Sequence, residues 1–261
     1  MESLSGNFSS STYLFIIILI RYTGLFLITP LFSSKMILSR IKIGLAFLLS
    51  IITFPLIKET ATVEFPGHLL ILTGDVIQEL SVGFLIGFIV LLVFSAVQLA
   101  GQFIDLRMGF RIANVFDPLT GASSPIMGQY KNIIVTLVFL VINGHHLLLK
   151  SLFKSFEIIP PGKAIFVNNL WQFIFRRSAD MFLIAFKIAL PVMGTIFVVD
   201  IILGFLARSV PQMNIFIVGL PVKILIGFMI IFLSLHIVVN YYNILFDNLF
   251  KDVMKLINMM G

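Results

Sequence analysis

The chain has 261 residues, of which 59% are hydrophobic and 11% charged, and its net charge is +6 at pH 7. Soluble domains are about half apolar and about one quarter charged, so this composition predicts an integral membrane protein rather than a soluble one. The lack of cysteine excludes disulfides, thiolate metal sites and cysteine nucleophiles. The positive charges form no dense basic run, so nucleic acid is not an expected partner.

Six apolar runs approach the roughly 20 residues that a helix needs to cross a bilayer. They cover residues 12–32, 41–57, 78–100, 133–152, 181–206 and 213–246. All six are expected to be helical, because an open strand in lipid leaves backbone groups unpaired. A further stretch, 68–77, is either a short separate helix or the front of the third one. The predicted fold is therefore an all-α membrane protein that forms one domain over residues 1–261.

Small residues and prolines modify these expected helices. Gly83 and Gly87 have the four-residue spacing that lets helix backbones approach closely, although such pairs also arise by chance. Pro191 lies inside the fifth run and is expected to kink it. The sixth run is too long for one crossing, so it is expected to bend or split near Pro221.

Five charged residues lie within or beside the apolar runs: Arg21, Asp75, Glu79, Lys187 and Asp200. Each costs about 2.5–3.5 kcal/mol at the centre of a lipid-exposed helix, so each is expected to face protein or water. One hypothesis is structural, with paired charges that hold helices or subunits in register. The alternative is an ion or proton pathway. Basic residues are divided evenly between the loops on the two sides, so the membrane orientation is not predicted.

The sequence offers no recognisable enzyme site. It contains no GxxxxGK[ST] phosphate loop, no HExxH zinc motif and no GxSxG nucleophile elbow. Only His145 and His146 are adjacent among the four histidines, and helical neighbours point about 100° apart. No catalytic residue, cofactor or metal site is therefore predicted.

An irregular segment around residues 105–132 separates the third and fourth runs. It carries turn residues together with the large apolar side chains of Met108, Phe110, Phe116 and Met127. Irregular backbone at membrane depth is tolerated only where protein buries it or water reaches it. From the residues alone, the segment is either an interfacial loop packed on helix ends or a specialised element inside the protein.

Four stretches together resemble one protein family. They are MGFRIANVFDP at 108–118, NGHHLLL at 143–149, IIPPG at 158–162 and ARSVPQMNIFIVGLPVK at 207–223. In this order and spacing they are similar to FliR, the flagellar export-gate family, which includes the equivalent injectisome subunit. The last stretch is the most specific, and it looks more flagellar than injectisome-like.

The resemblance implies a fold built from helical hairpins that looks like a fusion of FliP and FliQ. It implies a subunit of the flagellar export gate in the bacterial inner membrane and the flagellar basal body. The implied partners are FliP, FliQ and FlhB, with unfolded proteins as the transported substrates and membrane lipid around the complex. It implies no enzymatic activity and no cofactor.

The resemblance also implies that residues 106–125 plug the closed pore. The apolar face of this plug would comprise Met108, Phe110, Ile112, Val115 and Phe116, while the roles of Arg107 and Arg111 stay unassigned. A hydrophobic constriction can close a conduit by dewetting it.

The 207–223 stretch is expected to form a helical hairpin turn. A helix can restart after Pro211, and Gly219 with Pro221 is expected to break it again. This block serves either as a subunit contact or only as a folding turn, and its candidate residues are Pro211, Gln212, Asn214, Gly219 and Pro221. A different alternative for the whole chain is a secondary transporter of a small solute that uses Arg21, Lys187 and Asp200.

Overall fold

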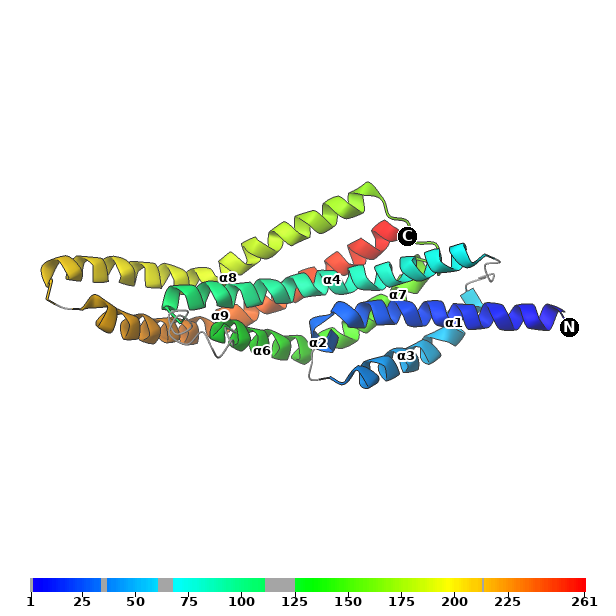
Figure 1. Cartoon of the computed structure of the whole chain (residues 1–261), viewed down its shortest axis with the longest axis horizontal. Helices are drawn as coiled ribbons and strands as arrows, with labels where there is room; N and C mark the ends of the chain where they lie inside the picture. Colours follow the sequence, from blue (N-terminus) through cyan, green and yellow to red (C-terminus); the bar gives the residue numbers. More distant parts are fainter. Residues whose placement is uncertain (1, 34–36, 61–67, 111–124, 213) are drawn as a thin grey trace. The chain divides into compact units, whose positions relative to one another are not determined.

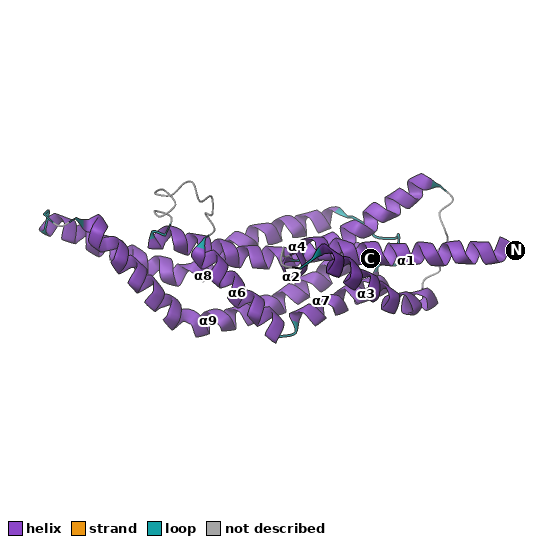
Figure 2. Ribbon diagram, turned by 60° about the horizontal axis from the view of Figure 1, so that its bottom comes forward, coloured by secondary structure: helices purple, strands orange, loops and turns teal. Residues whose placement is uncertain are grey.

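The computed structural model describes residues 2–33, 37–60, 68–110, 125–212 and 214–261. Within these ranges the chain is helical with short connections and has no strand (Figure 2). The all-α fold class predicted from composition is therefore confirmed. The helices, coloured along the chain in Figure 1, are α1 (Glu2–Ile28), α2 (Pro30–Ser33), α3 (Ser39–Thr60), α4 (Leu69–Met108), α6 (Ile126–Val141), α7 (Gly144–Ile158), α8 (Asn168–Ser209) and α9 (Ile215–Met260).

The chain divides into two compact units. Unit 1 comprises residues 1–92, 143–177 and 247–261, and unit 2 comprises residues 93–142 and 178–246. Helices α4, α8 and α9 each contribute residues to both units.

Unit 1 is built around α1, α3, α7 and the first part of α4. Helices α1 and α3 pack along each other, and the hydroxyls of Tyr22 and Thr53 form a buried hydrogen bond of 2.8 Å between them. Helix α4 lies against α1 at glycines. A Cβ atom at Gly83 would lie 2.1 Å from the carbonyl oxygen of Arg21, and one at Gly87 would lie 2.4 Å from a methyl group of Ile28. The close approach predicted from the Gly83–Gly87 spacing is confirmed.

Unit 2 contains α6, the second part of α4 and most of α8 and α9. Its interior holds three phenylalanine rings, from Phe94, Phe139 and Phe246, whose centroids lie 5.1–6.0 Å apart. Such separations are typical of favourable aromatic contacts. These rings link α4, α6 and α9 within the unit.

Of the two alternatives for residues 68–77, the front of a longer helix is confirmed, because α4 begins at Leu69 and continues without a break to Met108. Other predicted boundaries are wrong. The run 133–152 is two helices, since Asn143 adopts a left-handed conformation with φ of 56° that ends α6. Asparagine tolerates this conformation better than most residues. Helix α9 does not split at Pro221, which lies within two turns of its first residue, so the lost hydrogen bond and the ring clash affect only the start of the helix.

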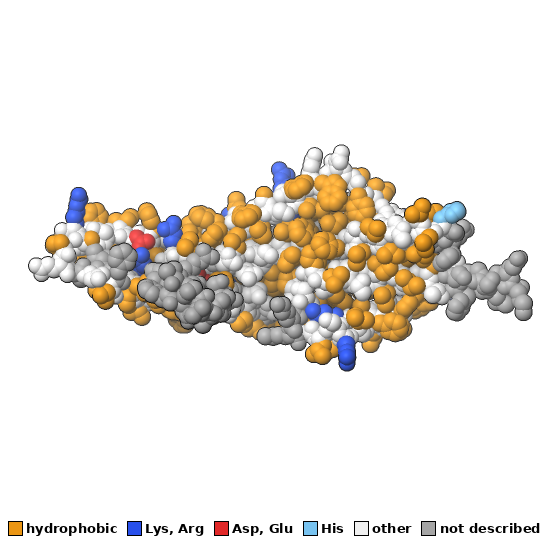
Figure 3. All heavy atoms as spheres, in the orientation of Figure 1, with side chains coloured by type: hydrophobic (Ala, Val, Ile, Leu, Met, Phe, Trp, Pro, Cys, Tyr) orange, Lys and Arg blue, Asp and Glu red, His pale blue; other side chains and the backbone are white. Residues whose placement is uncertain are grey.

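The outer surfaces of the helices are strongly apolar. Among the described residues, five helices are long and apolar enough to cross a membrane, or six if α6 and α7 together form one crossing. Only 22% of the apolar window in α3 and in α9, and 33% in α8, is buried inside the protein. Hydrophobic side chains cover much of the face seen in Figure 3, with few charged ones between them. This surface needs lipid or protein to cover it.

Candidate functional site

Among the described residues, the most buried charges are Arg21 of α1 and Glu79 of α4, in unit 1. Both side chains are fully buried, and the guanidinium makes two bonds to the carboxylate, Nε to Oε2 at 2.5 Å and Nη2 to Oε1 at 3.0 Å. Such a two-bond arrangement is the strongest geometry for an arginine–carboxylate pair. The two residues are 58 positions apart in the chain, so the pair joins α1 directly to α4.

The remaining polar atoms of this pair are also satisfied. Arg21 donates to the Ser155 hydroxyl and to the Ile159 carbonyl, each at 3.1 Å, and its guanidinium lies 4.1 Å from the centre of the Phe156 ring. Glu79 also accepts a 2.8 Å bond from the backbone N–H of Gly162. Buried ion pairs are tolerated when further hydrogen bonds satisfy both partners. The network therefore fastens α7 and the turn after it to α1 and α4.

A second acid of α4 lies near the same turn. The Tyr13 hydroxyl donates a 2.5 Å hydrogen bond to the carboxylate of Asp75. A Cβ atom at Gly162, whose φ is 74°, would lie 3.4 Å from that carboxylate. Gln78, one turn along α4, donates to the carbonyl of Ala164. The turn after α7 is thus held by Gln78 and Glu79 of α4, and Asp75 on the same side of that helix lies beside it.

The other two charges predicted within the apolar runs lie in unit 2. Asp200 of α8 forms an ion pair with Lys223 of α9, and both side chains are partly exposed. Lys187 lies on an exposed face of α8 and forms no ion pair with the described residues. Four of the five charges therefore have a polar partner within this chain, and Lys187 differs from them.

The two ends of the segment that would form the plug are fixed in unit 2. Asp105, which is 1% exposed at the end of α4, accepts a hydrogen bond from the backbone N–H of Met127 with each carboxylate oxygen, both at 3.1 Å. A Cβ atom at Gly101 would lie 2.3 Å from the Cα atom of Gly128. Helices α4 and α6 therefore meet where the segment begins and ends.

The predicted plug residues divide into two groups. Met108 is the last residue of α4 and is fully buried, with its side chain against Gly227 of α9. Phe110 meets Phe228 of α9 edge to face, with ring centroids 6.1 Å apart. Ile112, Val115 and Phe116 lie outside the described residues, as does Arg111, whereas Arg107 is exposed.

The residues predicted for a subunit contact lie at the connection between α8 and α9. Pro211, Gln212 and Asn214 are exposed there, and Gly219 is buried in the first turns of α9. Pro221 is exposed on the same helix. The helix restarts after Pro211 as predicted, but Gly219 and Pro221 do not break it.

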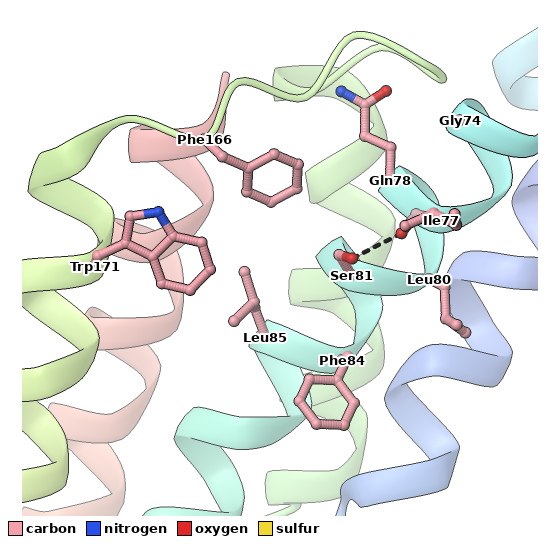
Figure 4. A pocket seen from close by; sticks show the side chains of 9 residues that line it. All are labelled: Gly74, Ile77, Gln78, Leu80, Ser81, Phe84, Leu85, Phe166 and Trp171. Carbon is pink, nitrogen blue, oxygen red and sulfur yellow. Dashed lines mark hydrogen bonds between the residues drawn. The ribbon is translucent and has the colours of Figure 1, made fainter. Parts of the chain in front are cut away.

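An apolar pocket of about 680 Å³ opens in unit 1, between α4 and the start of α8 (Figure 4). Its lining comprises Gly74, Ile77, Gln78, Leu80, Ser81, Phe84, Leu85, Phe166 and Trp171. The two polar side chains are already engaged, since Ser81 donates to the Ile77 carbonyl and Gln78 to that of Ala164. The lining has no charged group, so the pocket suits an apolar occupant, and no side chain in it could act as a general acid or base. In the ranges that the structure describes, no three histidine or acidic side chains gather to hold a metal ion.

Sequence reasoning missed the contacts that hold the ends of the plug segment. Asp105 had the one available signal, an acid only five residues beyond an apolar run. Lys131 of α6, assigned to a loop from the sequence, is only 2% exposed in unit 2. The contact of Gly101 with Gly128 had no local signal, because the two glycines belong to different helices.

Comparison with known proteins agrees with this architecture. Residues 12–249 match the family described as bacterial export proteins, family 1. The flagellar biosynthetic protein FliR of Bacillus subtilis (strain 168) is 36% identical over 250 residues, which cover 95% of each chain. FliR of Aquifex aeolicus (strain VF5) is 32% identical over 87% of this chain and 85% of its own. FliR of Escherichia coli (strain K12) is 26% identical over 92% of this chain and 91% of its own.

These matches cover the charge network, the ends of the plug segment and the α8–α9 connection alike, and the apolar helices fit an export protein set in a membrane. The chain therefore belongs to the family of bacterial export proteins that includes the flagellar biosynthetic protein FliR.

Proposed function

We propose that this chain is a subunit of the flagellar protein export gate in the bacterial inner membrane. It forms with FliP and FliQ the channel through which unfolded flagellar proteins leave the cell, and it contacts FlhB. The relatives described above carry flagellar names, which favours the flagellar system over an injectisome. Family membership argues against the secondary-transporter alternative.

The assembly part of this proposal is supported by the apolar surface. Helices α3, α8 and α9 leave most of their apolar windows uncovered by their own chain. Sister subunits and lipid together would cover these faces. A subunit of this kind is expected to contribute structure and not catalysis to export.

The plug part of the proposal, residues 106–125, is supported by one observation, the fixed ends of this segment. Asp105 binds the first turn of α6, and Gly101 lies against Gly128, so both ends of the segment are held at one place. Met108 and Phe110 anchor its beginning on α9. An anchored segment can block a shared conduit and move aside without loss of the surrounding helices.

The test removes the body of the segment and keeps its anchors. Residues 111–124 are replaced by a short glycine–serine linker, with Asp105 and Met127 retained. In cells that carry the complete export gate, the variant should make the membrane leaky to small ions while the subunit still copurifies with FliP and FliQ. A matched control replaces residues 61–67 with the same linker. A tight membrane in the first variant, with the complex intact, would contradict the plug role.

A further inference from the structure

Within unit 2, helix α8 has a packed face and an exposed face. The packed face comprises Ala185, Ile188, Ala189, Val192, Ile196, Val199 and Leu203, all of them at most 7% exposed. The opposite face, here called the outer seam, comprises Leu183, Lys187, Leu190, Gly194, Phe197 and Ile201, all of them exposed. At about 100° per residue, the centres of the two faces lie on opposite sides of the helix.

The outer seam has the spacing of a helix-docking surface. Its residues recur at alternating steps of four and three, the period that keeps one stripe of a helix against a partner helix. Its large apolar members, Leu183, Leu190, Phe197 and Ile201, are 45–56% exposed. Apolar exposure alone would also suit a helix that faces lipid, so two further residues decide between lipid and protein.

The first of these is Lys187, the second residue of the seam. It is the only charged residue between Asp180 and Asp200, a stretch about 28 Å long as a helix. It makes no ion pair with any residue that the structure describes, whereas Asp200 is paired with Lys223. A lysine is among the least tolerated residues at the centre of a lipid-exposed helix. A carboxylate on a facing helix would remove this penalty.

The second is Gly194, two turns further along the seam. A Cβ atom added there would meet nothing within 4 Å, so packing within this chain does not require glycine at this position. A glycine in an exposed helix interior lowers helix stability. On a helix-docking surface, the same glycine allows a second backbone to approach closely.

We propose that the outer seam of α8 docks an apolar helix of another protein, which places an aspartate or glutamate opposite Lys187. This inference deepens the proposed function, because it names one surface of the assembly and the chemistry of the partner. A second copy of this chain is a poorer occupant. Parallel copies would bring two Lys187 side chains together, and the two acids that flank the seam on α8, Asp180 and Asp200, both already have partners within this chain, Lys223 in the case of Asp200.

The test uses the full chain co-expressed with the other export-gate proteins, and it measures how much complex copurifies. Lys187→Arg should match the native chain. Lys187→Met should lower recovery, because it leaves the partner's carboxylate unpaired, and Lys187→Glu should lower it about tenfold or more by placing like charges together. Lys154→Glu, on the exposed side of α7, is the charge-reversal control. A lysine substituted for the facing acid of the partner should restore the Lys187→Glu complex.

Other outcomes would overturn the proposal. If Lys187→Met recovers as much complex as the native chain or more, the seam faces lipid. The chain has no native cysteine, so Gly194→Cys offers a unique crosslinking site, and a Gly194→Cys dimer of this chain would identify a second copy as the occupant. Gly194→Leu separates a loss of docking from misfolding. The isolated chain has room for the leucine side chain, so it should still fold, whereas a docked helix leaves no room, so less complex should copurify.

The copurification test distinguishes failure of the seam proposal from failure of the proposed function. If the native chain does not copurify with FliP and FliQ at all, the proposed function is wrong. If the native chain and Lys187→Glu copurify equally well, the export-gate assignment stands and only the seam is wrong.

Discussion

Replacement of Glu79 with glutamine tests whether the buried charge network holds unit 1 together. The substitution keeps the size of the side chain and part of its hydrogen bonding, but it removes the negative charge. Arg21 then keeps Ser155, the Ile159 carbonyl and the Phe156 ring as neutral partners, with no counter-charge in a fully buried position. We expect a large loss of stability and no change in the helical content of the native state.

The magnitude follows from the burial of both partners. Removal of one partner of a fully buried ion pair costs about 3–5 kcal/mol, because the other charge remains desolvated. A typical folded protein is stable by about 5–15 kcal/mol, so this loss is a large share of the total. Arg177 and Asp252 form the matched control, since their 2.7 Å pair lies in the same unit with side chains 35% and 17% exposed. Asp252→Asn should cost at most about 1 kcal/mol.

The assay is denaturant unfolding of the purified chain in detergent micelles, followed by tryptophan fluorescence. Trp171 is the only tryptophan and lies in unit 1, so its signal reports on the unit that contains the network. The double variant Arg21→Met with Glu79→Met should lose less stability than Glu79→Gln, because it leaves no buried charge unpaired, although the Gly162 N–H loses its acceptor and the Ile159 carbonyl loses its donor. If Glu79→Gln lies within 1 kcal/mol of the native chain, about the level of an exposed pair, the reasoning is refuted.

Two further substitutions test single contacts. Gly83→Ala should destabilise unit 1 by about 1–3 kcal/mol in the same unfolding assay, because its Cβ atom would press on the Arg21 carbonyl, whereas Gly44→Ala, where a Cβ meets nothing within 4 Å, should not. Asp105→Ala should cost about 0.5–2 kcal/mol by removing the acceptor of the Met127 N–H, and it should speed proteolysis between residues 109 and 125. Equal proteolysis of Asp105→Ala and the native chain would contradict that role for Asp105.

Composition predicted the fold class well, because a helix makes all of its backbone hydrogen bonds within one segment, as a chain in lipid requires. The apolar runs predicted helix ends poorly, because the backbone hydrogen bonds of a helix can continue beyond the last apolar residue of the run. The end of α9 shows this. Residues 247–260 lie beyond the predicted run, yet Leu249, Val253, Leu256 and Met260 recur at helical spacing and are buried in unit 1. That amphipathic period was a usable signal that a search for continuous apolar runs overlooks.

The candidate site was less predictable than the fold. The sequence predicted that charges within apolar runs need partners, but it did not indicate which partner belongs to which charge. Arg21 and Glu79 are separated by 58 positions, and Asp200 was as good a candidate for Arg21 as Glu79 was. Lys187 looked equivalent to the others in sequence. Only the structure shows that its side chain lies on an outer face of α8, where it forms no ion pair with the described residues.

The IIPPG stretch shows why this network could not be read from charged residues alone. Two of the groups that complete the Arg21–Glu79 pair are backbone atoms of this stretch, the carbonyl of Ile159 and the N–H of Gly162. Gly162 adopts a φ of 74°, a conformation that a side chain would strain. The glycine thus turns the backbone so that its N–H reaches the Glu79 carboxylate. A charge swap between Arg21 and Glu79 would therefore not restore the network, because the backbone carbonyl and N–H would then face the wrong partners.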